Sequence, residues 1–567
     1  MRVDAVYENA RVFTGSSWTS AVAMLHGRIV ALGEDAESLS TLVRVDLGGA
    51  VVVPGFHDAH NHQAMFGMTL DEVPLGDCKH VDEVYAAVAE RAAQVPPGGW
   101  IVGSGYDQNR LIGGHPTRHG LDRAAPGHLV RLQHNSRHMV VVSSNVLDQL
   151  DLANVPAGGD VVLDDDGSPT GLLREQAQLL LRPLIYPTPL DTLVRAIDRA
   201  GEQYLAEGIT SVQEAGVGGG LVGQTPAEVL AYQLARDRGV LRVRSTLMVS
   251  SAVLHELPDG AGFGLDLGLR TGMGDEWLRI GAMKLFADGS LIGRTAAMRE
   301  DFANEQGTLP SVTNPTAATA ETDVDEQNGC GPYPPPFGRI GNRGYLQQPE
   351  EELAETIFRA HAAGWQIATH AIGDRAIATI IDAYEAALTA NPRPDHRHRI
   401  EHCGVVSPDD VARIAALGLI PVPQGRFVNE IGDGMVAALG PEREPWCYRQ
   451  RTFLDAGCVL PGSSDRPVVN GAPLLGLADL VHRRTSSGRL LGPAERLTPR
   501  EALRAYTYGS AFAAFREREV GTLDVGYLAD FVVLSGDPTE QVEDLSVLAT
   551  VIGGRLAYER GMTDARP

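Results

Sequence analysis

Two histidines, His60 and His62, stand in the segment GFHDAHNH at residues 55–62, directly after a short apolar run. Because they are two positions apart, their imidazoles project to the same side of an extended backbone. Two neutral imidazoles at this spacing can share one divalent cation. The chain has 17 histidines, so an HxH pair alone could arise by chance, and the prediction depends on ligands elsewhere.

Three further candidate ligands each close an apolar stretch. His370 ends residues 365–370, His402 ends residues 398–402 and Asp465 ends residues 458–465. In a parallel α/β barrel the carboxyl ends of the strands meet at one mouth, which is where such barrels build their sites. The coincidence of these residues with His60 and His62 predicts a metal site at that mouth.

Lys284 lies inside the apolar segment at residues 279–288. A lysine on a buried strand is costly unless it is paired or neutralised. It could form a salt bridge with Asp288 or a neighbouring carboxylate. Alternatively, its amine could react with CO₂ to give an anionic carbamate that bridges two cations, and its position on the fourth predicted strand favours this second interpretation.

The elements that must position these residues alternate between buried strands and amphipathic helices, which is typical of a parallel sheet with crossover connections. Helical patterns cover residues 349–363, 374–389, 408–417 and 499–512. Eight strands indicate an α/β fold of the (β/α)₈, or TIM, barrel type. They are predicted at residues 51–56, 209–213, 243–249, 278–286, 365–370, 398–403, 419–423 and 458–462.

Both chain ends read as short strands separated by turns, and neither has enough strands for a core of its own. We therefore expect residues 1–54 and 516–567 to pair in a composite β-sandwich, with the barrel at residues 55–515. Residues 75–189 contain their own helix and strand patterns, which predicts an inserted α+β subdomain after the first strand. Residues 303–343, rich in Pro, Asn, Thr and Gly, are either an ordered lid or a disordered insertion.

The composition excludes several classes of protein. With 48 Lys and Arg against 72 Asp and Glu, the formal charge is −24, which disfavours binding to nucleic acid or an anionic membrane. The five cysteines are scattered without a CxxC pair, so a disulfide framework is not expected. The sequence shows neither a signal peptide nor an apolar run of about 18 residues, and a soluble cytoplasmic protein is the expectation.

Several motifs together resemble the amidohydrolase superfamily with a binuclear metal centre, in the branch that contains N-substituted formamide deformylase. The resemblance spans essentially the whole chain. It is carried by the order HxH, Lys, His, His, Asp and by six motifs: KLFADGSLIGRTA (284–296), HAIGDRA (370–376), RIEHCG (399–404), WIVGSGYD (100–107), PTRHGLD (116–122) and GSSDRP (462–467). The chain departs from the pattern at His57, which replaces an aliphatic residue and is expected to face away, and at Tyr106, which stands where the branch has Trp.

The resemblance implies a ligand set of His60, His62, Lys284, His370, His402 and Asp465. His60 and His62 would hold the more buried ion, His370 and His402 the more exposed one, and a carboxylated Lys284 would bridge them. Two divalent ions are implied. Zn²⁺ is favoured by these ligand types, and Fe, Mn, Co or Ni would also fit. Asp465 would bind metal and act as general base for a metal-activated hydroxide.

The predicted function is hydrolysis of a C–N amide bond in a small molecule, an N-acyl or N-formyl amine. A cyclic amide, carbamate or ester hydrolase would need the same ligands, and a heterocycle deaminase would use the same barrel, although Lys284 argues against it. A metal-stabilised scaffold without activity is disfavoured, because it has no use for an open metal site. A homodimer is a further expectation. Residues predicted near the substrate are His138, Tyr106, Gln424 and Arg449, and Asp58 is predicted to orient a ligand imidazole.

Overall fold

The computed structural model describes residues 2–106, 108, 111–134, 139–156, 159–260, 262–303 and 342–560. The chain divides into two compact units. The first holds residues 1–63, 201–223 and 236–567, and the second holds residues 64–200 and 224–235. No helix within the described part of the chain is both long and apolar enough to cross a membrane. The predicted lid at 303–343 falls almost entirely outside the described residues.

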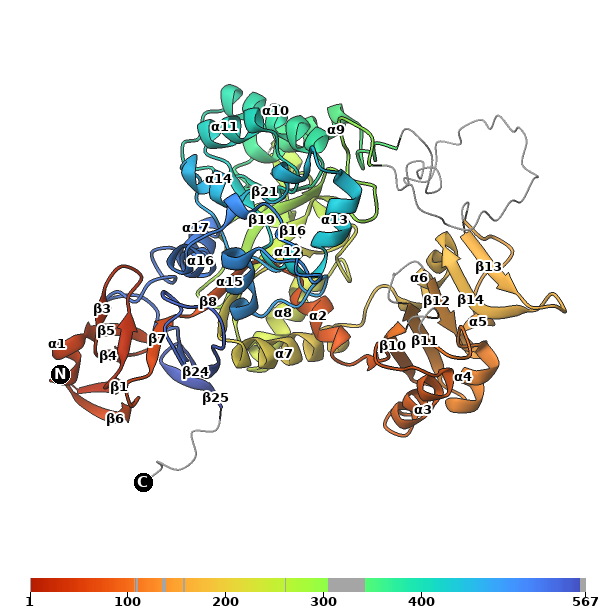
Figure 1. Ribbon diagram of the computed structural model, residues 1–567, viewed down its shortest axis with the longest axis horizontal. Coiled ribbons are helices and arrows are strands. Elements are labelled where there is room, and N and C mark those ends of the chain that lie inside the picture. The colour runs from red at the N-terminus through yellow and green to blue at the C-terminus, as the bar shows by residue number, and fades with distance from the viewer. Residues whose placement is uncertain are drawn as a thin grey trace. The chain divides into compact units, whose positions relative to one another are not determined.

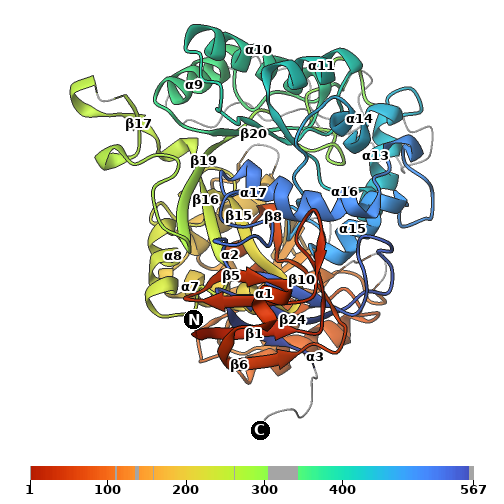
Figure 2. The ribbon, with the colours of Figure 1, turned by 90° about the vertical axis from the view of Figure 1, so that its left-hand side faces the viewer.

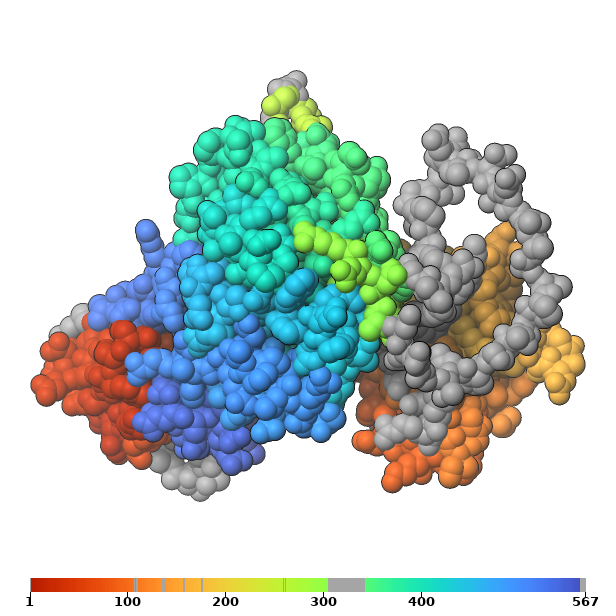
Figure 3. Space-filling view, turned by 45° about the horizontal axis from the view of Figure 1, so that its top comes forward, coloured from red at the N-terminus to blue at the C-terminus, as the bar shows by residue number. Residues whose placement is uncertain are grey.

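The two chain ends form a pair of sheets, as predicted (Figure 1). In Figure 3 the N-terminal residues, in red, lie beside the C-terminal residues, in blue. Antiparallel pairing of β7 (Val51–Pro54) with β23 (Phe531–Leu534) joins the two chain ends, with Val53 opposite Val532. Tyr7 packs edge-on against Phe531, with 5.2 Å between the ring centroids. The first sheet has the order β5 (Arg28–Leu32), β4 (Val22–Leu25), β1 (Arg2–Glu8) and β6 (Ser40–Asp46). The second has the order β25 (Arg555–Glu559), β24 (Val547–Ile552), β23 (Phe531–Leu534), β7 (Val51–Pro54), β2 (Arg11–Phe13) and β3 (Trp18–Thr19).

Seven parallel strands form a nearly closed barrel (Figure 2). Most of their residues are buried, as expected for strands covered on both faces. The fold class predicted from the alternating pattern is therefore confirmed. In spatial order the strands are β8 (Phe56–Asn61), β15 (Ile209–Val217), β16 (Arg244–Ser250), β19 (Leu278–Phe286), β20 (Ile367–Ala371), β21 (Arg399–His402) and β22 (Ile420–Val422).

Two strand predictions are wrong in detail. The apolar run at 51–56 supplies β7 of the sandwich, and the first barrel strand is β8, so His60 lies on the strand itself. The predicted eighth strand at 458–462 forms none, because the Gly462 amide donates to the Ala505 carbonyl (2.8 Å) and Pro461 has no amide hydrogen. This segment still lies along β8, with the Ala59 amide donating to the Gly462 carbonyl (2.9 Å).

Helices cover the outside of the barrel, and Figure 2 shows α9, α10 and α11 outside β20. Ser407 caps α11 by accepting from the Asp410 amide, and Thr498 with Glu501 forms a capping box at α16. The first unit contains α1 (Gly33–Glu37), α9 (Glu350–Ala362), α10 (Asp374–Ala390), α11 (Pro408–Leu417), α12 (Arg426–Glu430), α13 (Gly432–Leu439), α14 (Gln450–Asp455), α15 (Pro473–His482), α16 (Pro499–Arg504) and α17 (Ser510–Ala513). A short hairpin, β17 (His255–Glu256) with β18 (Phe263–Gly264), follows β16.

The second unit contains a mixed sheet with its own apolar core, which includes Val84, Ile101, Leu121 and Leu132. The strand order is β13 (Gly159–Leu163), β14 (Pro169–Glu175), β12 (Met139–Val142), β11 (Leu129–His134), β10 (Trp100–Tyr106) and β9 (Val73–Pro74). Its helices are α3 (Val81–Ala92), α4 (Arg118–Ala124), α5 (Ser144–Leu147) and α6 (Arg182–Ile185). Helices α2 (Gln63–Thr69), α7 (Leu190–Ala206) and α8 (Glu228–Asp237) lie at the boundaries of the two units along the chain.

Candidate metal centre

His60, His62 and Asp465 converge at the carboxyl end of β8. Their ligand atoms all lie within 4.8 Å of one another, and all three residues are buried. Asp465 Oδ1 lies 3.2 Å from His60 Nε2 and 3.1 Å from His62 Nε2. The backbone also connects them, because the Asp465 amide donates to the His60 carbonyl (2.7 Å). One carboxylate oxygen thus faces two imidazole nitrogens, which are suitable donors for a divalent cation.

The other two predicted histidines extend this group. The His402 ring lies 4.9 Å from the His60 ring and 4.5 Å from the His370 ring, measured between centroids. The four rings therefore run continuously from His62, which directly follows β8, to His370 on β20. Phe427 stacks on the outer side of His402, and Phe286 packs against His370.

Each imidazole has an oxygen atom near one nitrogen, within hydrogen-bond distance for His60, His402 and His370 and at 3.6 Å for His62. His60 Nδ1 contacts the Glu401 carboxylate, and His62 Nδ1 lies 3.6 Å from Glu214 Oε1. His402 Nδ1 donates to Gln424 Oε1 (2.9 Å), and His370 Nε2 donates to the Gly289 carbonyl oxygen (3.0 Å). An acceptor at one nitrogen fixes the proton there and leaves the other nitrogen as a ligand. The four rings thus present His60 Nε2, His62 Nε2, His402 Nε2 and His370 Nδ1.

Electrostatics distinguish the rings. Burial opposes protonation of His62, but Asp465 and Glu214 raise its pKa to about 9, so this ring must release a proton when it binds a cation. Burial lowers the pKa of His370 to about 3 and the pKa of His402 well below its usual value, so both rings are neutral and able to ligate. Burial also opposes ionisation of Asp465, but His60 and His62 beside it hold its pKa well below the usual range. Asp465 is therefore a carboxylate, as a ligand or a base must be.

Two of these residues have strained backbones. His402 and Asp465 adopt positive φ angles of 67° and 61°. A left-handed conformation costs a residue with a side chain about 1–2 kcal/mol. In both cases the strain falls where an apolar stretch ends and a candidate ligand begins, which is a common feature of functional sites.

Lys284 is on β19 and is 1% exposed. Its Nζ atom lies 5.0 Å from the centre of the Phe286 ring. Burial lowers the pKa of Lys284 to about 8, although Glu401 and Asp465 act in the opposite direction. The alternative partner, Asp288, accepts instead from the amides of Ala297, Ile372 and Gly373 at 2.8–3.0 Å.

Asp58 and Gln424 make contacts other than those expected of them, and His57, which was expected to face away from the site, is buried in the barrel. Asp58 accepts from the backbone amides of His60 (3.2 Å) and Ser464 (3.0 Å), so it holds two backbone segments together where we expected it to orient an imidazole. Gln424 is fully buried, and its amide supports His402, where a substrate contact was expected. His57 is 1% exposed beside Gln213, whose Nε2 lies 3.4 Å from its ring, so it belongs to the barrel core.

The remaining predicted substrate contacts stay predictions. Arg449 donates to the Val406 carbonyl (3.2 Å) and lies 3.7 Å from Glu495. Tyr106 is in the second unit, buried, with its hydroxyl 3.3 Å from His115 Nδ1. His138 is outside the described residues.

Sequence reasoning missed Glu401 and Glu214. A usable signal was present for Glu401, because Arg399 and Glu401 are two positions apart on one buried strand. Charged side chains that share a buried face must be paired. Glu214 has no comparable local signal, since its relation to His62 exists only once β15 lies beside β8.

The comparisons with known proteins agree with this geometry. A family model described as "Amidohydrolase family" matches residues 44–558. The chain is 28% identical to the putative amidohydrolase YtcJ of Bacillus subtilis, over 99% of this chain and 96% of the relative. It is 30% identical to the N-substituted formamide deformylase of Arthrobacter pascens, over 98% of each. The crystal structure of an uncharacterized metal-dependent hydrolase from Pyrococcus furiosus superimposes with a TM-score of 0.73 at 27% identity, over 94% of this chain and all of the other. The chain therefore belongs to the amidohydrolase family and is a hydrolase that acts on carbon–nitrogen bonds.

Proposed function

We propose that this protein hydrolyses the amide bond of an N-acyl or N-formyl amine with the help of two divalent cations. The observation that carries the proposal is the position of Asp465 Oδ1 between the Nε2 atoms of His60 and His62. The 30% identity to an N-substituted formamide deformylase supports the choice of a linear amide.

The residues fit a pair of cations. His60, His62 and Asp465 would hold one, and His370 Nδ1 with His402 Nε2 would hold the other. Zn²⁺ suits these imidazole and carboxylate donors. When bound, such cations polarise a substrate carbonyl and bring the pKa of water towards neutrality.

Lys284 is proposed to bridge the two cations as a carbamate. The amine must be neutral to attack CO₂, and a pKa of about 8 leaves roughly a tenth of it neutral at pH 7. The reaction forms one N–C bond and releases the proton of the amine to solvent. The product is an anion at a position where Lys284 would otherwise repel a cation.

Asp465 performs the proton transfers. Its carboxylate takes a proton from the attacking water and delivers it to the nitrogen of the leaving amine, so that the C–N bond breaks with release of a neutral amine. His60 and His62 keep Asp465 ionised for the first transfer.

The test combines metal content with turnover of an N-substituted formamide. Purified protein should contain close to two divalent ions per chain by elemental analysis, and a chelator should remove both the ions and the turnover. Full turnover by protein that is verified to be free of metal would overturn the proposal. The expected homodimer is a separate prediction, which light scattering can check.

A further inference from the structure

The Glu401 carboxylate lies at the centre of the barrel, directly behind a proposed ligand. The residue is fully buried on β21. One of its oxygens contacts His60 Nδ1, and both accept from the Arg399 guanidinium, at 2.7 Å to Nε and 3.0 Å to Nη2. A carboxylate held at both oxygens by a planar guanidinium has a fixed orientation.

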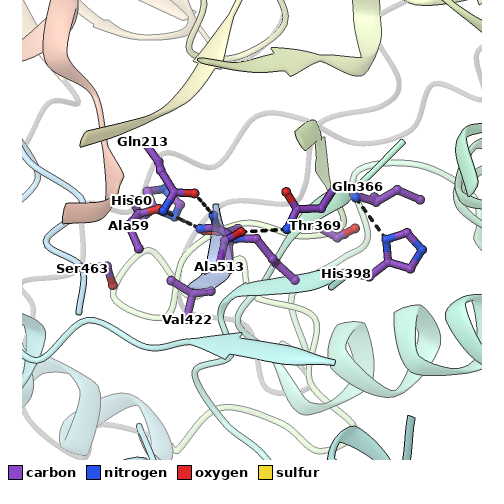
Figure 4. Close-up of polar contacts among 12 residues, drawn as sticks. Ala59, His60, Gln213, Gln366, Thr369, His398, Val422, Ser463 and Ala513 are labelled. Carbon is purple, nitrogen blue, oxygen red and sulfur yellow. Dashed lines mark hydrogen bonds and ion pairs between the residues drawn. The ribbon is translucent and has the colours of Figure 1, made fainter. Parts of the chain in front are cut away.

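Arg399 is itself held in place. It is fully buried, and its Nη2 donates to the Ala59 carbonyl (2.7 Å) while Nη1 contacts Gln213 Oε1. Gln213 in turn donates to the Ser510 carbonyl (3.1 Å). Figure 4 shows Gln213 close to Ala59 and His60 in the interior of the barrel. A connected set of buried hydrogen bonds thus extends from the barrel core to His60.

The chemistry of Glu401 determines which His60 nitrogen can bind metal. Both Glu401 oxygens accept from the Arg399 guanidinium, the geometry of a cation paired with an ionised carboxylate. An ionised carboxylate only accepts hydrogen bonds, so His60 must carry its proton on Nδ1. The lone pair is then on Nε2, the atom that lies 3.2 Å from Asp465 Oδ1.

The four acceptors behind the imidazoles differ in charge. The Glu401 carboxylate contacts His60 Nδ1 directly, whereas His402 Nδ1 and His370 Nε2 donate to the neutral oxygens of Gln424 and Gly289. Two other carboxylates lie at longer range, Asp288 at 3.5 Å from His370 Nε2 and Glu214 at 3.6 Å from His62 Nδ1. A carboxylate behind an imidazole makes it a more basic ligand, and losing such a partner typically lowers metal affinity 10- to 100-fold. The two halves of the site should therefore bind a cation with different strength.

We propose that Glu401, held by Arg399, is a positioning residue that fixes His60 as an Nε2 ligand and makes the His60–His62–Asp465 group the tighter of the two metal sites. Glu214, 3.6 Å from His62 Nδ1, and Asp288, 3.5 Å from His370 Nε2, are carboxylates at longer range, so each should have a smaller effect than Glu401. The inference rests on the proposed function only in that a divalent cation binds at these residues.

The test is a titration of metal-free, full-length protein with Zn²⁺ in competition with a chromophoric chelator. The wild type should show two classes of site. In Glu401→Gln, which keeps the shape and an acceptor oxygen but removes the charge, the dissociation constant of the tighter class should rise about 10- to 100-fold. The dissociation constant of the weaker class should change less than threefold. Glu214→Gln should raise the dissociation constant of the tighter class by less than Glu401→Gln does.

The chain offers a matched control. Glu517 accepts at 2.8 and 2.9 Å from Arg397, which precedes the first residue of β21 by two positions. Glu517 contacts no candidate ligand in the described structure. Glu517→Gln removes a carboxylate of the same kind and should leave both metal constants within twofold of the wild type. The visible spectrum of Co²⁺-loaded protein provides a second readout, which should change in Glu401→Gln and not in Glu517→Gln.

The possible results of the titration distinguish a failure of this inference from a failure of the proposed function. If the wild type binds two cations and Glu401→Gln binds the first with unchanged affinity and an unchanged Co²⁺ spectrum, the inference is wrong while the proposed function stands. If the wild type binds no divalent cation, the proposed function itself fails. If Glu401→Gln does not fold, Glu214→Gln decides by the same titration, and an unchanged tighter constant there would refute the inference.

Discussion

The buried ion pair between Arg244 and Asp530 connects barrel strand β16 to the C-terminal part of the sandwich. Arg244 Nε and Nη2 donate to the two Asp530 oxygens at 2.6 and 3.0 Å, with side chains 1% and 2% exposed. Asp530 also accepts from the Gly553 amide (2.7 Å), and its own carbonyl accepts from the Gly55 amide (3.0 Å), immediately before β8. We predict that this pair is needed for stability of the first unit.

The perturbation is Asp530→Asn. The Asn oxygen can still accept from the Gly553 amide. Its NH₂ group, however, would face an Arg244 nitrogen, and in the wild type the Arg244 nitrogens lie 2.6–3.0 Å from carboxylate oxygens. Removing one partner of a buried pair leaves an uncompensated charge and costs about 3–5 kcal/mol. The double variant Arg244→Met/Asp530→Leu removes both charges, so it should be less destabilised than Asp530→Asn.

Urea unfolding, followed by far-UV circular dichroism, measures these differences. The control is Glu385→Gln, which breaks a pair with Arg413 whose side chains are 52% and 34% exposed, and which should cost less than about 1 kcal/mol. The reasoning is refuted if Asp530→Asn is no more destabilising than Glu385→Gln, or if the double variant is less stable than Asp530→Asn.

Three further predictions follow from the site and the core. Asp465→Asn should lower kcat by about 10²–10⁴, the usual size of a lost acid–base contribution, with an unchanged circular dichroism spectrum; a variant with wild-type kcat would contradict the role of Asp465. Added Zn²⁺ should raise the thermal midpoint of metal-free protein in proportion to the logarithm of its concentration, because the cation binds the folded state; a midpoint independent of Zn²⁺ in calorimetry would contradict binding. His361, His396 and His398 pack together with their pKa values lowered by burial. Above pH 6.5 these rings are neutral in both the folded and the unfolded chain and do not change the free energy of unfolding. As the pH falls below 6.5, the unfolded chain binds protons that the folded chain does not bind. The free energy of unfolding should therefore fall by up to about 1.4 kcal/mol per pH unit for each ring. Urea midpoints that do not fall between pH 6.5 and 5.5 would contradict this reasoning.

Much of the fold could be predicted because the pattern of the sequence matches the period of each element. Buried parallel strands read as apolar runs and their helices as amphipathic stretches, and most barrel strands fall within a few residues of their predicted places. The run at 51–56 was misplaced because a continuous apolar segment does not reveal which of two sheets it joins. Residues 458–462 were misassigned because the Gly462 amide donates to the Ala505 carbonyl and the Ser510 hydroxyl oxygen, partners that only tertiary structure supplies.

The candidate ligands could be predicted from the sequence for a similar reason. A polar residue that closes a buried strand faces the mouth of a barrel, whatever its neighbours. The hydrogen-bond partner of each ligand could not be predicted in this way, because it comes from another part of the chain. Gln424 is a plausible substrate contact in the sequence, and only the hydrogen bond from its Nε2 to the Val422 carbonyl (3.0 Å) turns Oε1 towards His402.

We expect this site to hydrolyse a linear amide and to release an amine. The most direct measurement is product analysis by metal-loaded enzyme on a panel of formamides, acetamides, cyclic amides and aminated heterocycles, with amine and ammonia scored separately and His60→Ala as the blank. We predict amine from at least one linear amide and none from the blank. Ammonia from a heterocycle, with every linear amide inert, would contradict the claim and identify a deaminase.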